Sequence, residues 1–398
     1  MLRTALHHLK VVDFTQIGAG PTCSMLLADM GADVVKVEAP EGELGRALGP
    51  PWIGNDAALF HAFNRNKRGL CLDLKHPEGM AVARTLISKA DIVIESMRPG
   101  VMERLGLAYS QLAADHPNLI YCSISAYGQT GPYADRAGVD GILQADTGLM
   151  SLIGSPGAEP GKVQAPVVDV VTGYLACVGV LARLQQRNET GAGGYLDVNL
   201  MNCALALQQP SFTSYLADGQ LPERMGSAAP YSAPNEAFAT ADGWIMVAAY
   251  NGGRWERLCH ALALPQLIDD ARFASSPQRV ANRDAMRAAL NDTFASQSTD
   301  HWLAVLKQAD ILCARVATYA DVEQHPQVAA NQMIASVSDP AAGTVRMPGF
   351  PINSEESNRL PHAPAPRRGE HSREILVGAG YGVAEVQGLV GRGVVGCK

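Results

Sequence analysis

The amino-acid sequence predicts an α/β protein whose N-terminal third forms a doubly wound parallel sheet. Short β-branched runs alternate there with helical patterns, which is typical of βαβ units. Residues 11–14 have the pattern of a strand, and a glycine-rich turn with Pro21 leads into a helical stretch that ends at Gly31. Proline in the first turn and glycine just past the end are usual helix boundaries. A second strand is predicted over residues 33–38.

Three more strand patterns extend the predicted sheet, over residues 70–74, 91–95 and 119–124. Helical patterns follow Pro77 and Gly100. Five strands within roughly 125 residues are typical of a doubly wound domain.

The composition of the chain predicts two domains. Residues 1–217 form the first part of the large domain, and a linker rich in Pro, Gly, Ser and Ala covers 218–235. A smaller α+β domain is predicted over 236–338. A second loop-rich stretch then opens the segment 339–398, which returns to the large domain.

Composition also excludes several classes of protein. The chain has 398 residues, of which 47% are apolar, and this is enough for a packed core. A net charge of −7 argues against a protein that binds the phosphate backbone of nucleic acids. The eight cysteines form no C-x-x-C pair and have no metal-ligand spacing with the ten histidines. We therefore expect reduced thiols, a cytoplasmic protein and no metal; residues 1–8 show no secretory signal.

The longest apolar stretch, residues 165–184, is about long enough to span a bilayer. It contains Pro166, Asp169 and Arg183, which are costly in a membrane. We therefore expect a buried helix of a folded domain, continuing to about residue 188.

The turn after the first strand, Gly18-Ala19-Gly20, allows three interpretations. Dinucleotide binding is one, because Glu38 lies where an acid would bind the ribose. However, Cys23 replaces the third glycine of that motif, and Pro21 lacks an amide that could face a pyrophosphate. A plain tight turn and a backbone cradle for another ligand are the alternatives.

Basic residues recur after the predicted strands. The run 64–68 contains three cations, and Lys75, Arg98 and Arg104 follow the next two strands. A solvated loop is one interpretation of the run. The other is an anionic ligand such as a phosphorylated small molecule, because ligands bind at the strand ends of open α/β sheets.

Asp169 stands alone among valines immediately before the predicted helix. It is either the N-cap of this helix or a desolvated nucleophile. The sequence contains no G-x-S-x-G, P-loop, H-E-x-x-H or kinase motif, so serine hydrolysis, nucleotide hydrolysis and zinc chemistry lose support.

These residues resemble the family III coenzyme A (CoA) transferases of the CaiB/BaiF type. The resemblance runs over nearly the whole chain and is carried by Asp169 and by the segments 12–15, 19–21, 29–38, 64–68, 72–75, 98–100, 127–133 and 369–371. It implies a large Rossmann-like domain, a small domain, and ring-shaped protomers that interlock as a homodimer. It also implies that Asp169 is the nucleophile that exchanges CoA between an acyl-CoA and a free acid.

The resemblance also implies the residues of the site. CoA is expected along Ile17, Gly18, Ala19, Leu72, Lys75, Ser96, Met97, Arg98, Arg104, Arg136 and Ala137. Arg46 is expected to replace a CoA-binding arginine that aligns with Ala39. Gly18 admits the thioester end of the ligand, and Tyr127, Tyr133, Tyr231 and Asn235 are candidates for the acyl pocket.

Departures from the family pattern limit the substrate. The oxalate-specific members have a glutamine where Gly18 stands and a glycine run in place of residues 226–230, so oxalate is not expected. We expect a small dicarboxylic or branched acid, with succinyl-CoA as donor. The α-methylacyl-CoA racemases of this fold use a histidine where this chain has Val139. A racemase, an NAD-binding oxidoreductase and a non-catalytic CoA-binding protein are the alternatives.

Overall fold

The computed structural model describes residues 2–352 and 362–397. The chain divides into two compact units. Unit 1 comprises Met1–Met150, Lys162–Gln220 and Pro326–Lys398, and unit 2 comprises Ser151–Gly161 and Leu221–His325.

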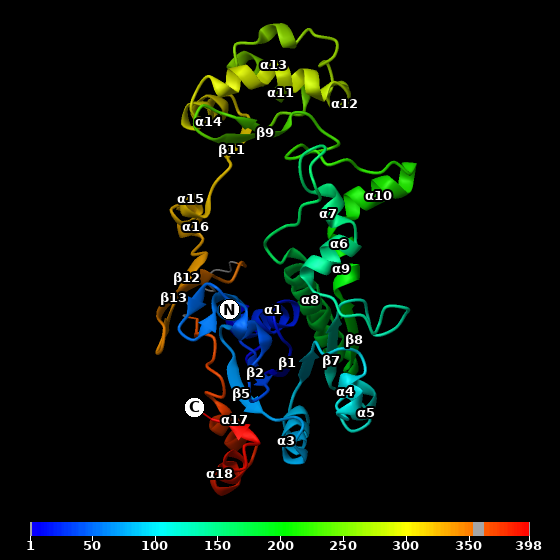
Figure 1. The fold of residues 1–398 in the computed structure, drawn as a ribbon, viewed down its shortest axis with the longest axis vertical. Coiled ribbons are helices and arrows are strands. Elements are labelled where there is room, and N and C mark those ends of the chain that lie inside the picture. Colours follow the sequence, from blue (N-terminus) through cyan, green and yellow to red (C-terminus); the bar gives the residue numbers. More distant parts are fainter. Residues whose placement is uncertain (1, 353–361, 398) are drawn as a thin grey trace. The chain divides into compact units, whose positions relative to one another are not determined.

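Unit 1 is built on a seven-stranded sheet with the order β14-β5-β2-β1-β6-β7-β8 (Figure 1). Its strands are β1 (Lys10–Phe14), β2 (Asp33–Glu38), β5 (Arg68–Leu72), β6 (Ile92–Glu95), β7 (Ile120–Ser125), β8 (Gly194–Asn199) and β14 (Val395–Gly396). Neighbouring strands are parallel, except that β14 runs antiparallel to β5. The central, mostly parallel sheet of the predicted α/β fold is therefore confirmed.

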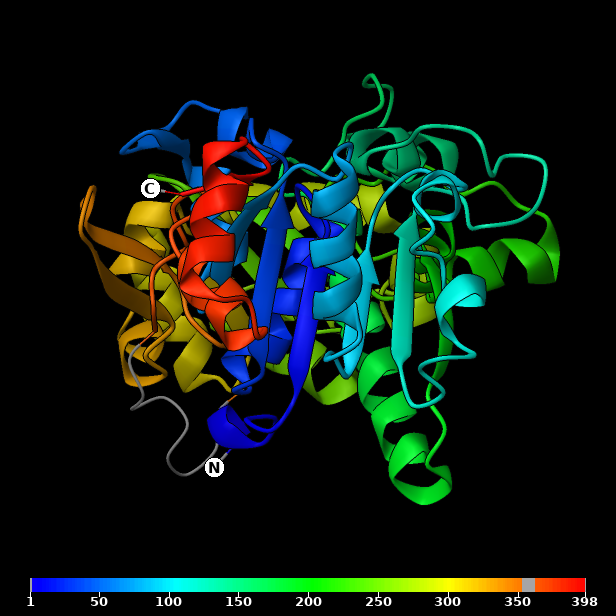
Figure 2. The same ribbon diagram turned by 90° about the horizontal axis from the view of Figure 1, so that it is seen from below.

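Both faces of this sheet are covered, because alternate strand residues enter different cores. Val11 packs on the face of α1 (Ala19–Asp29) and α8 (Val167–Thr190), and Val12 packs on the opposite face. That opposite face is covered by α3 (Pro77–Ile87), α17 (Ser372–Gly378) and α18 (Val383–Gly391), as Figure 2 shows. The near-continuous apolar runs of the strands follow from this double burial.

The remaining elements of unit 1 are short. Its helices are η1 (Leu2–Thr4), η2 (Leu44–Ala47), α2 (Ala58–Asn64), α4 (Val101–Arg104), α5 (Tyr109–Leu112), α6 (Asp140–Asp146), α9 (Leu200–Leu207), α10 (Gln209–Asp218) and α16 (Pro326–Ala330). Helix α7 (Leu149–Leu152) begins in unit 1 and ends in unit 2. Two hairpins complete the unit, β3 (Trp52–Ile53) with β4 (Asp56–Ala57) and β12 (Ile334–Asp339) with β13 (Gly343–Pro348).

Helices α1 and α8 pack closely, because small residues separate them. A Cβ on Gly173 of α8 would lie 2.6 Å from the carbonyl oxygen of Ala19 and 2.5 Å from the Cβ of Thr22.

Among the described residues, α8 is the one helix long and apolar enough to cross a bilayer by length and composition. The prediction of a buried helix holds for one face only, since Val168 and Val180 are fully buried whereas Val178 is 60% exposed.

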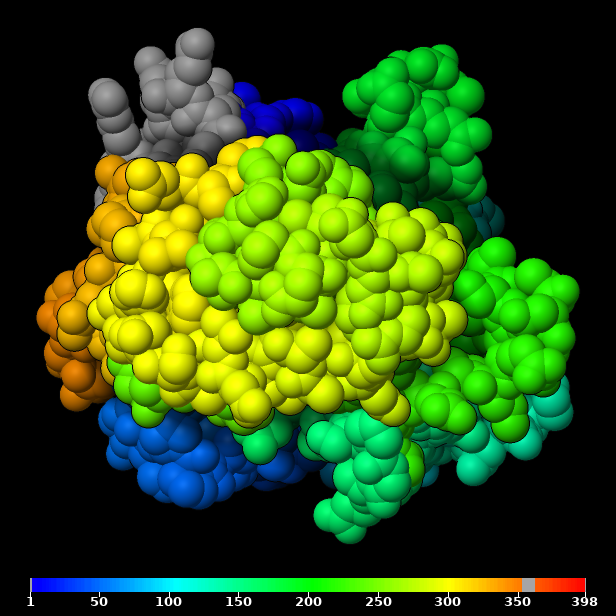
Figure 3. Space-filling view, turned by 90° about the horizontal axis from the view of Figure 1, so that it is seen from above, coloured from blue at the N-terminus to red at the C-terminus, as the bar shows by residue number. Residues whose placement is uncertain are grey.

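Unit 2 has a three-stranded antiparallel sheet of order β11-β10-β9. Its elements are β9 (Asn235–Ala239), β10 (Trp244–Ala248), α11 (Gly252–Ala261), η3 (Pro265–Leu267), α12 (Ser276–Ala281), α13 (Arg283–Ala295), α14 (Thr299–Gln308), β11 (Leu312–Arg315) and α15 (Tyr319–Glu323). Phe238 stacks on Phe294 at 4.7 Å between ring centroids, and Trp302 contacts the same ring. Figure 3 shows one face of this unit in light green and yellow.

The two units divide the chain at other positions than the predicted 1–217, 218–235, 236–338 and 339–398. Residues 151–161 belong to unit 2, where the amide of Gly226 bonds the carbonyl oxygen of Gly154. The chain re-enters unit 1 at Pro326 rather than at residue 339, because β12 pairs along its whole length with β13.

Candidate active site

A cavity of about 300 Å³ lies at the carboxyl ends of β1, β6 and β7, beside the start of α8. This edge is where open α/β sheets bind ligands. Its lining includes most of the β1–α1 turn, the loop after β6, the residues after β7, and Asp169. All of these residues belong to unit 1.

Asp169 occupies the first turn of α8, which begins two residues earlier at Val167. The carboxylate of Asp140 accepts hydrogen bonds from the amides of Val168 at 2.8 Å and Asp169 at 3.2 Å. Asp140 therefore caps this helix from outside. The N-cap interpretation of Asp169 is wrong, and its side chain is left free for another role.

The Asp169 carboxylate receives no hydrogen bond from any residue that the structure describes. Burial raises its pKa to about 7, and the neighbouring Asp140 carboxylate adds to the rise. A carboxylate that lacks donors and has lost part of its hydration is a better nucleophile than one in water. The site therefore holds an acid that can attack a carbonyl carbon.

Gly18 makes room for this carboxylate. A Cβ built on Gly18 would lie 2.3 Å from Oδ2 of Asp169 and 2.8 Å from its carboxyl carbon. No side chain fits in this space. Gly18 therefore lies directly against the carboxylate, and its role in admitting the thioester stays a prediction.

Six predicted CoA contacts line the same cavity as Asp169. They are Ile17, Gly18, Ala19, Ser96, Met97 and Arg98. Arg98 is exposed at the rim, where its guanidinium can reach a phosphate. The Ser96 hydroxyl accepts the amide of Gln16 at 3.1 Å, and so joins the loop after β6 to the β1–α1 turn.

The other predicted CoA contacts do not line this cavity. Lys75, Arg104 and Ala137 are exposed on loops or short helices of unit 1. Leu72 is fully buried in the core beneath α3, so its side chain has no surface that a ligand could contact. For Leu72 the expectation from the resemblance is corrected.

Arg46 has another function than the predicted one. Its guanidinium donates two hydrogen bonds of 2.7 Å to Glu38, one of 2.8 Å to Asp56 and one of 2.9 Å to the carbonyl oxygen of Pro366. It also stacks 3.7 Å above the ring of Phe60. These bonds occupy four of its five N–H donors, so Arg46 is a member of a buried structural ion pair and not a phosphate ligand.

The same pair rules against a dinucleotide. Glu38, the candidate ribose ligand, is buried and bound on both oxygens by Arg46. Arg46 also keeps the pKa of Glu38 low against the effect of burial, which would raise it. The NAD interpretation of the glycine turn is therefore wrong.

The basic run 64–68 is neither a solvated loop nor a phosphate site. Arg65 binds both oxygens of Asp29, at 2.9 and 2.5 Å, and the Lys67 ammonium lies 3.2 Å from Asp13. Arg68 pairs with Asp33 at 2.7 Å. The cations neutralise carboxylates inside unit 1, and this part of the anionic-ligand prediction is wrong.

The tyrosines predicted for the acyl pocket fall into two groups. Tyr127 and Tyr133 meet edge to face at 5.5 Å, and the Arg136 guanidinium lies 4.3 Å from the centroid of Tyr133. The Tyr127 hydroxyl donates to Asp146 at 3.0 Å. Tyr231 and Asn235 belong to unit 2, and none of these four residues lines the cavity of Asp169.

Two acids that matter to the site were not predicted. Asp140 could have been found, since it follows Val139 in the stretch that separates this chain from the racemases. Glu95 ends β6 and had no sequence signal beyond its position. Its carboxylate accepts the amide of Met97 at 2.8 Å and so shapes the loop that carries Arg98.

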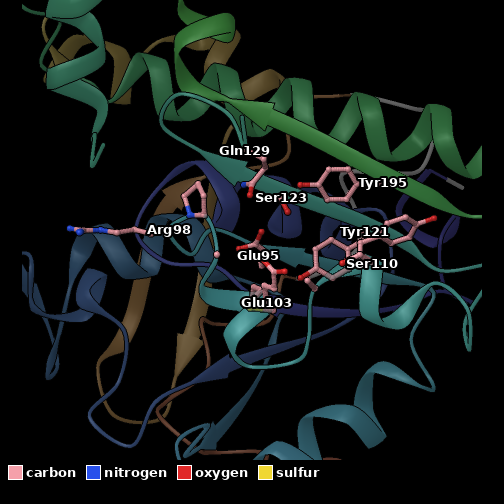
Figure 4. A pocket seen from close by; sticks show the side chains of 13 residues that line it. Glu95, Arg98, Glu103, Ser110, Tyr121, Ser123, Gln129 and Tyr195 are labelled. Atoms are coloured by element: carbon pink, nitrogen blue, oxygen red, sulfur yellow. The ribbon is translucent and has the colours of Figure 1, made fainter. Parts of the chain in front are cut away.

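Glu95 faces a second cavity of about 260 Å³, on the other face of the sheet. Figure 4 shows it among Tyr121, Ser123 and Tyr195, with Arg98 at the side. Burial raises the pKa of Glu95 to about 7. Among the described residues, no cluster of three or more His, Cys, Asp or Glu side chains could hold a metal ion.

Comparison with known proteins agrees with this geometry. The family model described as CoA-transferase family III matches residues 6–372. Succinyl-CoA:glutarate CoA-transferase of Mus musculus is 33% identical, over 93% of this chain and 85% of that protein. Succinyl-CoA:mesaconate CoA-transferase of Haloarcula hispanica is 38% identical, over 95% of this chain and 97% of that protein.

Solved structures show the same relation. The crystal structure of a CaiB/BaiF family protein from Brucella suis matches with a TM-score of 0.83 and 36% identity, covering 93% of this chain and 98% of that one. A structural match of this size, joined to a family match over most of the sequence, leaves one assignment. The chain belongs to CoA-transferase family III.

Proposed function

We propose that this protein transfers CoA from succinyl-CoA to a small dicarboxylic acid, with Asp169 as the nucleophile. The observation that carries the proposal is the Asp169 carboxylate, which lies in the cavity against Gly18 and receives no hydrogen bond from the described part of the chain. The relatives named for succinyl-CoA and for glutarate or mesaconate support the choice of donor and of acid.

The first half of the reaction releases the donor acid. A carboxylate oxygen of Asp169 attacks the thioester carbonyl, the C–S bond breaks, and a mixed anhydride and CoA thiolate form. The thiolate then attacks the aspartyl carbonyl of the anhydride. Succinate leaves, and Asp169 remains as a CoA thioester.

The second half repeats these steps with the acceptor. Its carboxylate attacks the aspartyl thioester and expels the thiolate, and the thiolate then attacks the acyl carbonyl of the new anhydride. The product thioester leaves and the Asp169 carboxylate is regenerated, with no net proton taken up. Dividing one difficult exchange into several acyl transfers is what covalent catalysis provides.

Backbone amides at the start of α1 can stabilise the oxyanions. The amides of Ala19 and Gly20 stand in the first turn, where no helical carbonyl can accept them, and both residues line the cavity. A helix N-terminus favours negative charge, so these amides suit the tetrahedral intermediates. Pro21 removes the next amide without loss to the site.

The racemase alternative gains no support from the cavity. Val139 lines it in the place where a racemase needs a proton carrier, and a valine cannot move a proton. Asp140 is held by two amides of α8 and by the side-chain amide of Gln144. Incubation with a 2-methylacyl-CoA in D₂O without acceptor acid should leave the α-carbon unlabelled, and labelling would support the racemase.

The main test supplies a panel of acyl-CoA donors and acids and follows CoA exchange by mass spectrometry. Asp169→Asn keeps the shape of the side chain and should lower exchange at least about 10³-fold while CoA still raises the melting temperature. Asp115→Asn, an exposed carboxylate of the same unit, is the matched control. Near-normal exchange by Asp169→Asn would contradict the proposal.

A trapping experiment tests the intermediate. Hydroxylamine added after the donor should convert the aspartyl thioester into a hydroxamate on the peptide that carries Asp169 and on no other.

We also propose that the protein is a cytoplasmic homodimer. Its eight cysteines are all free thiols, which suits a reducing compartment.

A further inference from the structure

Ile17, which lines the cavity beside Gly18, has a left-handed backbone with a φ of 70°. This conformation is unfavourable for any residue with a Cβ, and more so for a β-branched one. Such residues persist only where their surroundings hold them. The turn that carries Ile17 therefore needs a restraint.

Side chains from three other places in unit 1 provide that restraint. Three consecutive amides of the turn each donate to a side chain, namely Thr15 to Asp13 at 2.8 Å, Gln16 to Ser96 at 3.1 Å, and Ile17 to Glu43 at 3.0 Å. The last bond fixes the strained residue itself. It comes from a residue 26 positions further along the chain.

Glu43 is itself held in place. It is 5% exposed, and the carboxylate oxygen that accepts Ile17 also lies 3.3 Å from the ammonium of Lys36. Lys36 is fully buried and donates to the carbonyl oxygen of Thr15 at 3.0 Å, so it contacts one end of the turn directly and the other end through Glu43. Burial alone would lower the pKa of Lys36, but Glu43 and its neighbouring acids raise it above the usual value.

We infer that Glu43 is a positioning residue of the transfer reaction, which holds Ile17 in its left-handed conformation and thereby places Gly18 against Asp169. The inference rests on the proposed function for the reaction, but its effect on CoA binding is independent of the nucleophile. Without the carboxylate, Ile17 relaxes to a negative φ, and the backbone from Ile17 to Gly20 moves within the cavity.

The test compares Glu43→Leu, which removes the acceptor, with Glu43→Gln, which keeps an oxygen. We expect Glu43→Leu to raise the KM for succinyl-CoA about tenfold and Glu43→Gln to raise it less, because strain of this kind corresponds to roughly one order of magnitude or more. The matched control is Asp29→Asn. Asp29 is a fully buried carboxylate of the same unit, paired with Arg65, and it should change melting temperature but not KM.

Relief of strain separates positioning from plain stability. Glycine adopts a positive φ without cost, so Ile17→Gly should recover CoA affinity in the Glu43→Leu background to within about threefold of Ile17→Gly alone. Additive effects of the two substitutions would overturn the inference. So would a KM for Glu43→Leu equal to that of Asp29→Asn.

A second variant applies if Glu43→Leu does not fold. A Cβ on Gly45 would lie 3.0 Å from Oε1 of Glu43 and 3.6 Å from the Cα of Ile17. Gly45→Ala should therefore displace the carboxylate without removing its charge, and raise the KM in the same direction. An unchanged KM in a folded Gly45→Ala protein would count against the inference.

Calorimetric titration of free CoA into Asp169→Asn distinguishes the two proposals. If Asp169→Asn still exchanges CoA, the proposed nucleophile is wrong, but weaker binding of CoA after adding Glu43→Leu would still support Glu43. If Asp169→Asn is inactive and Glu43→Leu leaves its CoA affinity unchanged, the positioning inference alone fails.

Discussion

Asp169 combines two properties that usually exclude each other in a folded protein. It is partly buried, which raises its pKa, yet no described group donates a hydrogen bond to its carboxylate. Asp29 and Glu38, two buried carboxylates of unit 1, are by contrast bound by arginines. An unpartnered buried acid costs stability, and proteins retain such groups mainly where chemistry needs them.

The raised pKa of Asp169 predicts a pH-dependent reaction. Attack needs the carboxylate, so kcat/KM should rise with pH and level off above about 7. Asp140→Asn removes the neighbouring negative charge and should move this limb to lower pH. A pH profile of exchange measures the shift, with Glu95→Gln as the control for the other acid that titrates near 7. An unmoved limb in Asp140→Asn would contradict this assignment.

The raised pKa of Asp169 also affects folding stability, which should fall as pH rises whereas kcat/KM increases. Unfolded aspartate loses its proton near pH 4, whereas folded Asp169 keeps it until about 7. The folded state therefore binds more protons in this window, and the stability contribution of Asp169 falls as pH rises from about 4 to 7. In Asp169→Asn this slope should be absent.

Gly18→Ala tests the access that glycine provides. The added methyl would lie 2.3 Å from Oδ2 of Asp169, so the carboxylate or the turn must move. We expect exchange to fall at least about 100-fold, since misplacement by about 1 Å is enough for such a loss. Activity assays measure the loss of exchange, and thermal melting checks that the variant is folded. Near-normal exchange in a folded protein would show that Asp169 reacts from another position.

At the scale of elements, the contact of α1 with α8 places the nucleophile. Gly173 allows these helices to approach, and their N-termini carry Gly18 and Asp169 to the same cavity. Gly173→Ala should separate them, because its Cβ would lie 2.6 Å from a backbone oxygen. We expect about 1–3 kcal/mol of destabilisation and a lower kcat.

Denaturant unfolding measures that loss, and Gly179→Ala is the matched control. Gly179 lies on the same helix, where an added Cβ would meet only Leu196 at 3.6 Å. Alanine at this second position should stabilise the helix slightly, since glycine is a poorer helix former. Equal effects of the two substitutions would show that the close approach of the helices is unimportant.

At the scale of the whole molecule, unit 1 presents apolar side chains that a single chain leaves exposed. On α8 and α10 they include Tyr174, Val178, Phe212 and Leu216, the last two 43% and 68% exposed. On each helix the two side chains are four residues apart and so lie on one face. Exposed apolar faces of this kind are typical of surfaces that bind another protein. They support the proposed homodimer.

Sedimentation velocity should accordingly give about twice the mass of one chain. Val178→Glu places a charge in the apolar group on α8 and should raise the concentration at which the dimer dissociates. Val383→Glu is the matched control, because Val383 of α18 is 63% exposed but lies on the other side of the sheet. A single-chain mass at micromolar concentration would contradict the homodimer.

Local patterns determined much of this fold. The five predicted strands appear as β1, β2, β5, β6 and β7, and α1 ends near Gly31 as its boundary residues indicate. Strand alternation and helix ends depend on residues a few positions apart, so they can be read in one dimension. The family motifs likewise identified Asp169 and the loop of Ser96 to Arg98, which line one cavity.

Only the tertiary structure decided which charged groups are free. The sequence does not show whether Arg46, Arg65 and Lys67 bind an anionic ligand or pair with a carboxylate of the protein. Their partners are Glu38, Asp29 and Asp13, which lie on other elements. The cap of α8 likewise comes from Asp140, 29 residues before the residue it frees. Ion pairs depend on distances across the fold, which periodicity does not encode. Among residues 2–352 and 362–397, these distances leave the Asp169 carboxylate without a hydrogen-bond donor.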